Sequence, residues 1–166
     1  MYKIVGAKGN IQNIDDFLDK IRDFSDKNNV SIQVFNADLI YGEKHLISAY
    51  EHAERAMEQK TNTTNSLEME ILLYAAGERQ LKLAIPKMGV KKGKSNLAIV
   101  VVKSKSDKII DNLLSEFNLK RDDKVLEGDE NTLKKFGLNQ KEINTVTKAK
   151  YQNLILEKVA LVDIIK

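Results

Sequence analysis

The 166-residue chain contains no cysteine, a single proline and no long apolar segment. Without cysteine it can form neither a disulfide nor a thiolate metal site. No apolar run is longer than Leu97–Val102, which has the length of a strand and is far too short to span a membrane. The opening residues, MYKIVGAKGN, lack the apolar core of a signal peptide. We therefore expect a cytoplasmic protein with no membrane segment.

Length and composition favour a single folded domain over residues 1–166. Hydrophobic residues make up 42% of the chain and charged residues 31%, a balance that is typical of folded proteins rather than disordered ones. A chain of this length can also bury a substantial core.

The spacing of apolar residues predicts an α/β or α+β fold. We expect Asn13 and Ser106 to cap helices, and Asn65 with Glu68 to form a capping box. Pro86 is expected to bend or end a short helix. The predicted strands are 1–7, 30–35 and 97–102, and the main predicted helices are 14–28, 43–58, 66–76, 80–88, 107–117 and one from about 148. The expected architecture is a small, mostly antiparallel sheet of three to four strands covered by several helices.

Positive charge is concentrated between Lys60 and Lys94. This segment holds seven basic and three acidic residues, a net charge of +4, whereas the whole chain carries +3, so the remainder sums to −1. A localised basic surface typically binds a polyanion such as a nucleic acid.

A turn rich in small residues lies inside this basic segment. Ala75, Ala76 and Gly77 leave an uncluttered backbone next to Arg79 and Gln80. Such a surface could admit a nucleobase or a sugar edge, with the guanidinium on a phosphate or stacked on the base. The alternative is a helix–turn–helix corner whose small residues serve only packing.

The sequence Gly93-Lys94-Ser95 invites comparison with a phosphate-binding P-loop. That motif needs four residues between its glycines and lies between a strand and a helix. Here three residues separate Gly89 from Gly93, and the expected order is helix, loop, strand. A small nucleotide-binding or phosphoryl-transfer enzyme is therefore the alternative function, and a basic connecting loop is the favoured interpretation.

No group of residues has the spacing of a catalytic or metal site. His45 and His52 lie seven residues apart on one predicted helix without further ligands nearby. Asp15, Asp16 and Asp19 fall in the first turns of a helix, where negative charge suits the helix dipole. We expect no cofactor, no metal and no enzymatic activity.

The last helix carries apolar residues on two faces. One broad arc is the natural core face, and it contains Tyr151, Leu154, Ile155, Val159, Leu161, Val162 and Ile165. The opposite side carries Leu156, Ala160 and Ile164 at four-residue spacing. This second stripe indicates either burial on both sides or a contact with another molecule.

The central part of the chain resembles a known family. The residues Glu70–Gln80 (EILLYAAGERQ), followed by Ala84 and by Gly89-Val90, resemble the signature of the Cgi-type kinase-binding subunits of the KEOPS complex. The alanine-rich segment Ala49–Ala56 and the strand Leu97–Val102 match in order and spacing, as does the final helix. The cysteine-free, lysine-rich composition suggests an archaeal source.

The resemblance implies a non-catalytic subunit. Such a subunit binds and stimulates a Bud-type atypical protein kinase, and through this kinase it joins the other KEOPS subunits. It also recruits tRNA by the 3′ CCA end, so that the complex can form threonylcarbamoyladenosine at position 37.

The resemblance also directs attention to two sets of residues. We expect the tRNA to contact Ala76, Gly77, Arg79 and Gln80 through the CCA end, and Lys60, Lys87, Lys91 and Lys92 through phosphates. We expect the kinase to dock on Leu156, Ala160 and Ile164, together with the alanine face formed by Ala49, Ala53 and Ala56.

Overall fold

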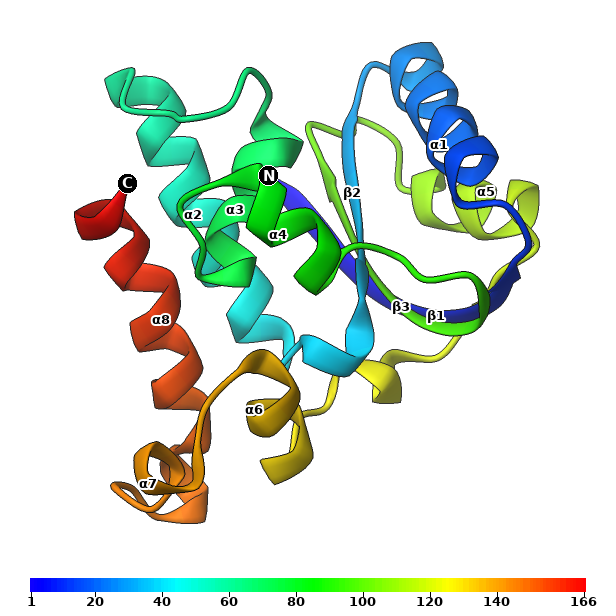
Figure 1. The fold of residues 1–166 in the computed structure, drawn as a ribbon. Coiled ribbons are helices and arrows are strands. Elements are labelled where there is room, and N and C mark those ends of the chain that lie inside the picture. Colours follow the sequence, from blue (N-terminus) through cyan, green and yellow to red (C-terminus); the bar gives the residue numbers. More distant parts are fainter. The chain divides into compact units, whose positions relative to one another are not determined.

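The computed structural model describes all 166 residues, which form two compact units (Figure 1). Unit 1 comprises Met1–Ala37 and Val90–Leu126, and unit 2 comprises Asp38–Gly89 and Glu127–Lys166. The chain therefore leaves unit 1 and returns to it once before it completes unit 2. None of its helices combines the length and the apolar character that crossing a membrane requires.

Unit 1 is built on a four-stranded antiparallel sheet with the order β2-β3-β1-β4. β1 (Tyr2–Ile11) pairs along its whole length with β3 (Gly93–Val102), and β2 (Ser31–Asn36) pairs with the second half of β3. The short β4 (Lys120–Arg121) pairs with the middle of β1, and a 3₁₀ turn, η2 (Asp123–Leu126), follows it. β3 is central, which explains why its last six residues are an unbroken apolar run.

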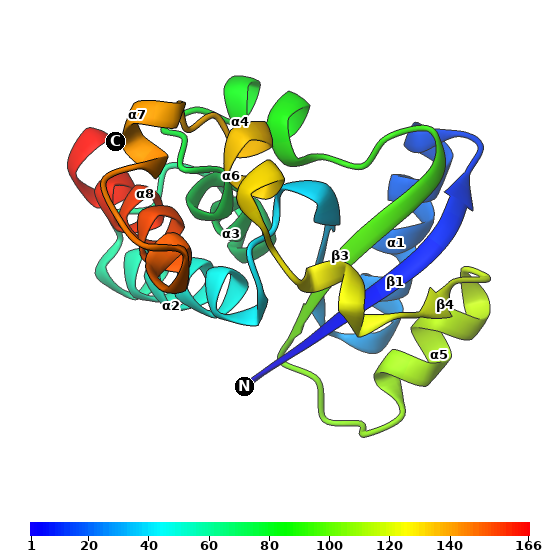
Figure 2. The same ribbon diagram turned by 90° about the horizontal axis from the view of Figure 1, so that it is seen from below.

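Two helices cover one face of this sheet, α1 (Ile14–Asn28) and α5 (Ile109–Glu116) (Figure 2). Their apolar faces join alternate strand residues such as Val5, Ile99 and Val101 in one buried cluster. α1 is amphipathic and begins at Asn13, whose side chain accepts a hydrogen bond from the Asp16 N–H at 2.9 Å, as the sequence predicts.

Unit 2 consists of helices. It opens with a 3₁₀ turn, η1 (Ala37–Leu39), at the boundary with unit 1. The helices that follow are α2 (Glu43–Gln59), α3 (Leu67–Ala76), α4 (Leu81–Met88), α6 (Glu130–Phe136), α7 (Gln140–Ile143) and α8 (Tyr151–Ile165), the last preceded by the 3₁₀ turn η3 (Lys148–Lys150). The expected α+β fold with a small antiparallel sheet is confirmed.

α3 is the central helix of unit 2. Every side chain from Glu70 to Ala76 is buried, and α2, α4 and α8 all pack against it. A helix that is apolar on all sides is stable only when neighbours surround it, and α3 fits that description. One of its buried side chains, however, is a carboxylate.

Three details differ from the sequence prediction. The cap of α3 is Ser66, whose hydroxyl accepts from the Met69 N–H, and not Asn65. Ser106 does not cap α5, which begins after Lys108 without a side-chain cap. Pro86 lies inside α4 and does not end it, since the helix continues to Met88. Proline has no backbone N–H, so the helix lacks one backbone hydrogen bond at this position.

Candidate functional site

The turn between α3 and α4 requires a glycine. α3 ends at Gly77, which has left-handed dihedrals (φ 65°, ψ 30°) and whose N–H donates to the Tyr74 carbonyl at 3.0 Å. A Cβ at this position would lie 3.3 Å from Cζ of Phe136 and 3.4 Å from Cβ of Lys158. Both the backbone conformation and the close packing therefore select glycine here.

Beside this turn lies an open hollow of about 490 Å³, here called the α3–α4 hollow. Its lining comes from the polar loop before α3 and from the start of α4, and consists of Thr63, Thr64, Asn65, Ser66, Met69, Arg79, Gln80, Leu81 and Lys82. The lining contains two basic side chains, Arg79 and Lys82, and no acidic one. Both are exposed, and neither forms an ion pair, so their charges are available to an anionic ligand.

Lys87 has a different role from the one expected. Its ammonium donates to the Ala76 carbonyl at 2.7 Å, lies 3.5 Å from the Glu78 carboxylate and sits 3.8 Å above the Phe136 ring. Burial lowers the pKa of Lys87, and Glu78 opposes that shift. Lys87 thus stabilises the carboxyl end of α3, and its contact with an RNA phosphate stays a prediction. The methyl group of Ala76 is likewise buried.

His45 holds the same end of α3 from the other side. The His45 side chain is fully buried, and its Nδ1 accepts a hydrogen bond from the Tyr41 N–H at 3.1 Å. The ring proton is therefore on Nε2, which donates to the Ala75 carbonyl at 2.8 Å. Burial lowers its pKa to about 4, which keeps the ring neutral at physiological pH. No group of three or more histidine, aspartate or glutamate side chains is arranged to bind a metal ion.

The other basic residues of the predicted site belong to different units of the chain. Lys60 is exposed at the left-handed end of α2 (φ 59°), where the chain enters the loop that lines the hollow. Lys91 and Lys92 belong to unit 1, whereas the residues that line the hollow belong to unit 2. Gly93, Lys94 and Ser95 form the start of β3 rather than a phosphate-binding loop before a helix, which removes the geometry that a P-loop enzyme needs.

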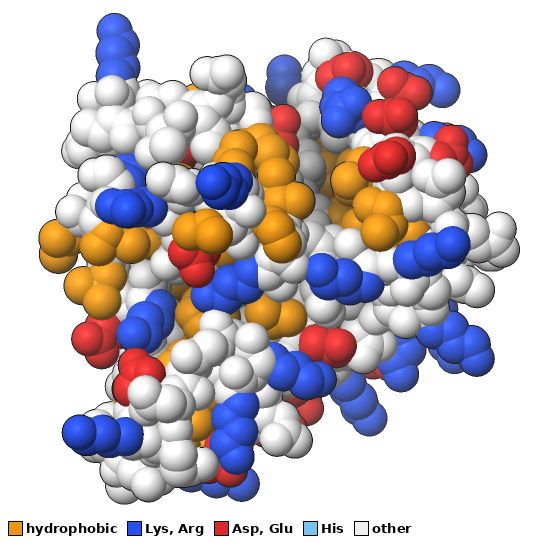
Figure 3. Space-filling view, in the orientation of Figure 1, with side chains coloured by type: hydrophobic (Ala, Val, Ile, Leu, Met, Phe, Trp, Pro, Cys, Tyr) orange, Lys and Arg blue, Asp and Glu red, His pale blue; other side chains and the backbone are white.

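α8 exposes an apolar surface, as one of the two sequence alternatives predicted. Ile164 is 77% exposed, Ile165 45% and Leu161 36%, and Ala160 is exposed as well. Leu161 and Ile165 were expected on the core face; only Ile155, Val159 and Val162 are buried there. The exposed residues Ala160, Leu161, Ile164 and Ile165, with the half-buried Leu156, are here called the α8 stripe. Hydrophobic side chains gather over α8 at the left of the space-filling view (Figure 3).

The alanine face of α2 is not part of this surface. Ala49 and Ala53 are completely buried and Ala56 is 2% exposed, because α2 packs against α3 and α8. Their small side chains permit close approach of helices within unit 2. The structure thus places all three inside unit 2, and their contact with a kinase stays a prediction.

Sequence comparison identifies the relatives of the chain. The profile of the family described as "Kinase binding protein CGI-121" matches residues 9–163. The chain belongs to this family. The "Regulatory protein Cgi121" of Methanocaldococcus jannaschii is 29% identical over 141 residues, which cover 82% of this chain and 86% of that protein. The resemblance seen in the sequence is thus confirmed, and with it a kinase-binding, regulatory character.

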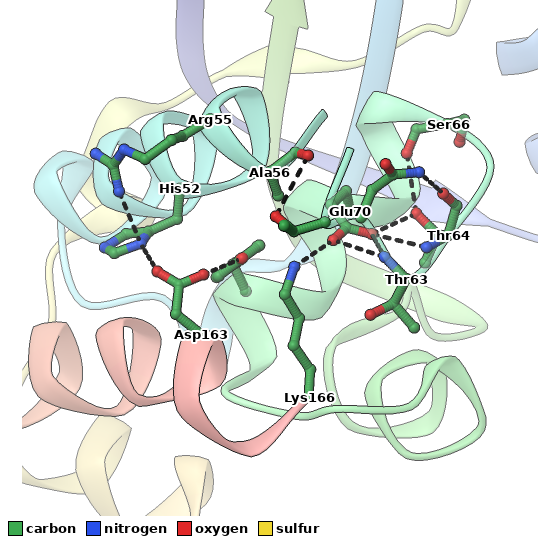
Figure 4. A network of polar contacts seen from close by, with 12 residues as sticks. His52, Arg55, Ala56, Thr63, Thr64, Ser66, Glu70, Asp163 and Lys166 are labelled. Carbon is green, nitrogen blue, oxygen red and sulfur yellow. Dashed lines mark hydrogen bonds and ion pairs between the residues drawn. The ribbon is translucent and has the colours of Figure 1, made fainter. Parts of the chain in front are cut away.

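One part of the chain was not singled out by sequence reasoning. The carboxylate of Glu70, fully buried in α3, accepts hydrogen bonds from the backbone of Thr63 and Thr64 and from the ammonium of Lys166 (Figure 4). Burial by itself would raise the pKa of Glu70, but these donors outweigh it and hold the pKa below its usual value. Glu70 directly precedes the apolar run Ile71–Ala76 of α3, and this position is the sequence signal that points to a buried contact.

A second group of polar contacts lies beside it. Asp163 of α8 accepts from the Tyr74 hydroxyl, and its other oxygen lies 2.8 Å from Nδ1 of His52 (Figure 4). The His52 ring is stacked on Tyr74 at 5.4 Å between ring centroids. These contacts fix the last turns of α8 on α2 and α3.

A larger hollow, of about 570 Å³, lies in unit 1 beside α1. Its floor contains Phe17, Phe24 and Phe117, but its rim carries acids and lysines in nearly equal number. Because neither sign of charge dominates, this hollow does not indicate an anionic or a cationic ligand.

Proposed function

We propose that this chain is the non-catalytic subunit of a KEOPS complex that binds a Bud-type kinase and recruits tRNA by its 3′ CCA end. In this role it stimulates the kinase and supports formation of threonylcarbamoyladenosine by the complex. The observation that carries the proposal is the presence, within unit 2, of an exposed apolar stripe on α8 together with a hollow that has basic but no acidic side chains.

The α8 stripe supports the kinase contact. An isoleucine that is 77% exposed at the end of a helix is costly in water, and a cluster of such residues is typical of a protein-binding surface. Burying a large aliphatic side chain contributes about 1.5–3 kcal/mol, so Ile164 is the strongest candidate for an anchor. Matching family members are described as kinase-binding, which supplies the class of partner.

The α3–α4 hollow supports the RNA contact. Arg79 and Lys82 can bind phosphates, while the hydroxyl and amide groups of the loop from Thr63 to Ser66 can form hydrogen bonds with bases and sugars. Gln80 and the small Gly77 border the same region. Lys60 stands at the start of the loop, where it can add to the attraction for phosphate.

The kinase contact is tested by Ile164→Glu. Burying a charge in place of an anchor should weaken binding of the Bud-type kinase from the same genome by about tenfold to 100-fold. The matched control is Ile85→Glu, since Ile85 is 48% exposed and lies on α4, a different helix from the one that carries the stripe. Calorimetric titration that gives equal kinase affinities for the two variants would contradict the assignment. Far-UV circular dichroism verifies that both remain folded.

The RNA contact is tested with a tRNA acceptor minihelix, intact or lacking its terminal CCA. The intact RNA should bind more tightly, and Arg79→Glu should remove that preference. Arg22→Glu is the matched control, because Arg22 is an exposed arginine on α1 of unit 1. RNA binding that does not depend on the CCA end would show that the hollow contributes only general electrostatic attraction.

A further inference from the structure

The carboxylate of Glu70 connects the two surfaces of the proposed function. On one side Oε1 accepts from the Thr64 N–H at 2.9 Å and from the Thr64 hydroxyl at 2.7 Å, and the Thr63 N–H lies 3.1 Å and 3.2 Å from the two oxygens. On the other side Oε2 accepts from the Lys166 ammonium at 3.0 Å. The Glu70 side chain is completely buried, and that of Lys166 is 7% exposed. Figure 4 shows the carboxylate between the loop and the end of α8.

The loop side of this contact lines the α3–α4 hollow. Thr63 and Thr64 both belong to its lining, and Glu70 is the group that accepts their backbone N–H groups. Hydrogen bonds to a buried, charged acceptor are stronger than bonds between neutral groups, so they specify one conformation of the loop. The shape of this wall of the hollow therefore depends on the orientation of the Glu70 carboxylate.

The helix side of the contact adjoins the α8 stripe. Ile164 and Ile165 are exposed, and they lie between two anchored side chains, Asp163 and Lys166. The Lys166 ammonium also lies 4.7 Å from the centre of the Tyr74 ring. The final turn of a helix opens more readily than its middle, so the last turn of α8 can leave the docked state, in which Lys166 lies on Glu70, by fraying. A partner that covers Ile164 and Ile165 in the docked state removes the frayed one.

We propose that the Lys166–Glu70 contact couples the two surfaces, so that a protein bound on the α8 stripe raises the affinity of the α3–α4 hollow for RNA. The inference rests on the proposed function and extends it from two separate binding surfaces to interdependent ones. The direction follows from the contacts: a docked α8 holds Lys166 on Glu70, and Glu70 then holds Thr63 and Thr64 in the loop conformation that forms the hollow. By linkage, RNA in the hollow raises the affinity for the partner on the stripe by the same factor.

The test compares RNA affinity with and without saturating kinase. Fluorescence anisotropy with the CCA-ended minihelix gives the two dissociation constants, and their ratio is the coupling factor. We expect about a fivefold ratio or more for the unaltered chain. Lys166→Met, which removes the ammonium and keeps most of the side-chain volume, should reduce the ratio to about one. Lys166→Arg, which keeps a donor for Glu70, should restore it.

Lys134→Met is the matched control for the loss of one positive charge. Lys134 lies on α6, where it pairs at 3.8 Å with Glu130 and has no contact with Glu70. This variant should keep the full coupling factor. Thermal unfolding of each variant verifies that unit 2 is intact at the temperature of the titration.

The outcomes separate the inference from the function on which it rests. Coupling that is lost in Lys166→Met, kept in Lys134→Met and restored in Lys166→Arg supports the inference. If the unaltered chain binds both partners with a ratio of one, or if Lys166→Met keeps the ratio, the inference is overturned and the proposed function stands. If the unaltered chain binds neither RNA nor kinase, the proposed function fails and the inference fails with it.

Discussion

Replacement of Glu70 by alanine should strongly destabilise the chain. The substitution removes a buried carboxylate that accepts from two backbone N–H groups, the Thr64 hydroxyl and the Lys166 ammonium. Removing one partner of a buried ion pair costs about 3–5 kcal/mol, chiefly because the remaining polar groups lose their partners in a site that excludes water. The Lys166 side chain is nearly buried, so its ammonium cannot regain full hydration without leaving its site.

This cost is a large share of the stability of an ordinary domain, about 5–15 kcal/mol. For a chain of this size each kcal/mol lowers Tm by about 2–4 °C, so the variant should melt about 6–20 °C below the unaltered protein. Urea titration followed by far-UV circular dichroism gives the free energy of unfolding, and this signal is suitable because the chain has no tryptophan.

The pH dependence supplies a second measure of the same contact. The pKa of Glu70 lies below its ordinary value of 4.5, so the carboxylate contributes stability above that pH and loses the contribution as the pH falls through the lowered pKa. The difference in unfolding free energy between the unaltered chain and Glu70→Ala should therefore be constant above about pH 5 and should shrink in more acidic solution.

The control is Glu68→Ala, two residues earlier in the same helix. Glu68 lies in the first turn of α3, and it forms no ion pair. Losing an acid from a first turn costs about 0.3–1 kcal/mol. The largest loss of unfolding free energy expected of the control is about 1 kcal/mol. If the losses for Glu70→Ala and Glu68→Ala differ by less than about this amount, the carboxylate does not hold the loop and α8 as described.

Three further changes test other parts of unit 2. Between pH 6.5 and pH 4 the unfolded chain takes up a proton on His45 that the folded chain excludes, so the free energy of unfolding should fall by about 3 kcal/mol over this range. His45→Gln should flatten this part of the plot of unfolding free energy against pH, and parallel plots for the two chains would refute the assignment to His45. Gly77→Ala should lower the unfolding free energy by at least about 1–2 kcal/mol, because the positive φ of Gly77 strains any residue with a Cβ and this Cβ would lie close to Phe136. An unchanged urea midpoint would contradict both the strain and the close packing. Arg79→Gln should reduce the slope of log K for RNA against log salt by about 0.7–0.9, and an unchanged slope would show that Arg79 contacts no phosphate.

Local signals accounted for most of the secondary structure. Asn13 caps α1, Gly77 ends α3 and the β-branched run in β3 forms a buried strand, because each of these features depends on neighbouring residues and on a simple apolar period. The start of α3 was missed by one residue. Asn65 and Ser66 can both cap a helix, and the choice of Ser66 depends on how the loop is held by Glu70.

The two surfaces of the proposed function were predicted less completely. The exposed side of α8 at Ala160 and Ile164 follows from helical periodicity, and the cationic turn at Arg79 follows from the local charge. The partial burial of Lys87 could not be predicted, because the Phe136 ring below its ammonium lies on α6, about fifty residues further along the chain. The same holds for the alanines of α2, whose spacing suits contact with another molecule as well as contact with α3 and α8.

The amino-acid sequence by itself determined the class of fold, the order of helices and strands, the position of the basic turn and membership in a kinase-binding family. These properties arise from short-range periodicity, capping and the identity of neighbouring residues, all of which act within a few turns of the chain. Only the tertiary structure decided which charged groups are free and which are bound inside, since Glu70 and Lys166 lie 96 positions apart and meet only when α3 and α8 pack together. A buried charge is stable only beside its partner, and the packing of distant helices decides where that partner is.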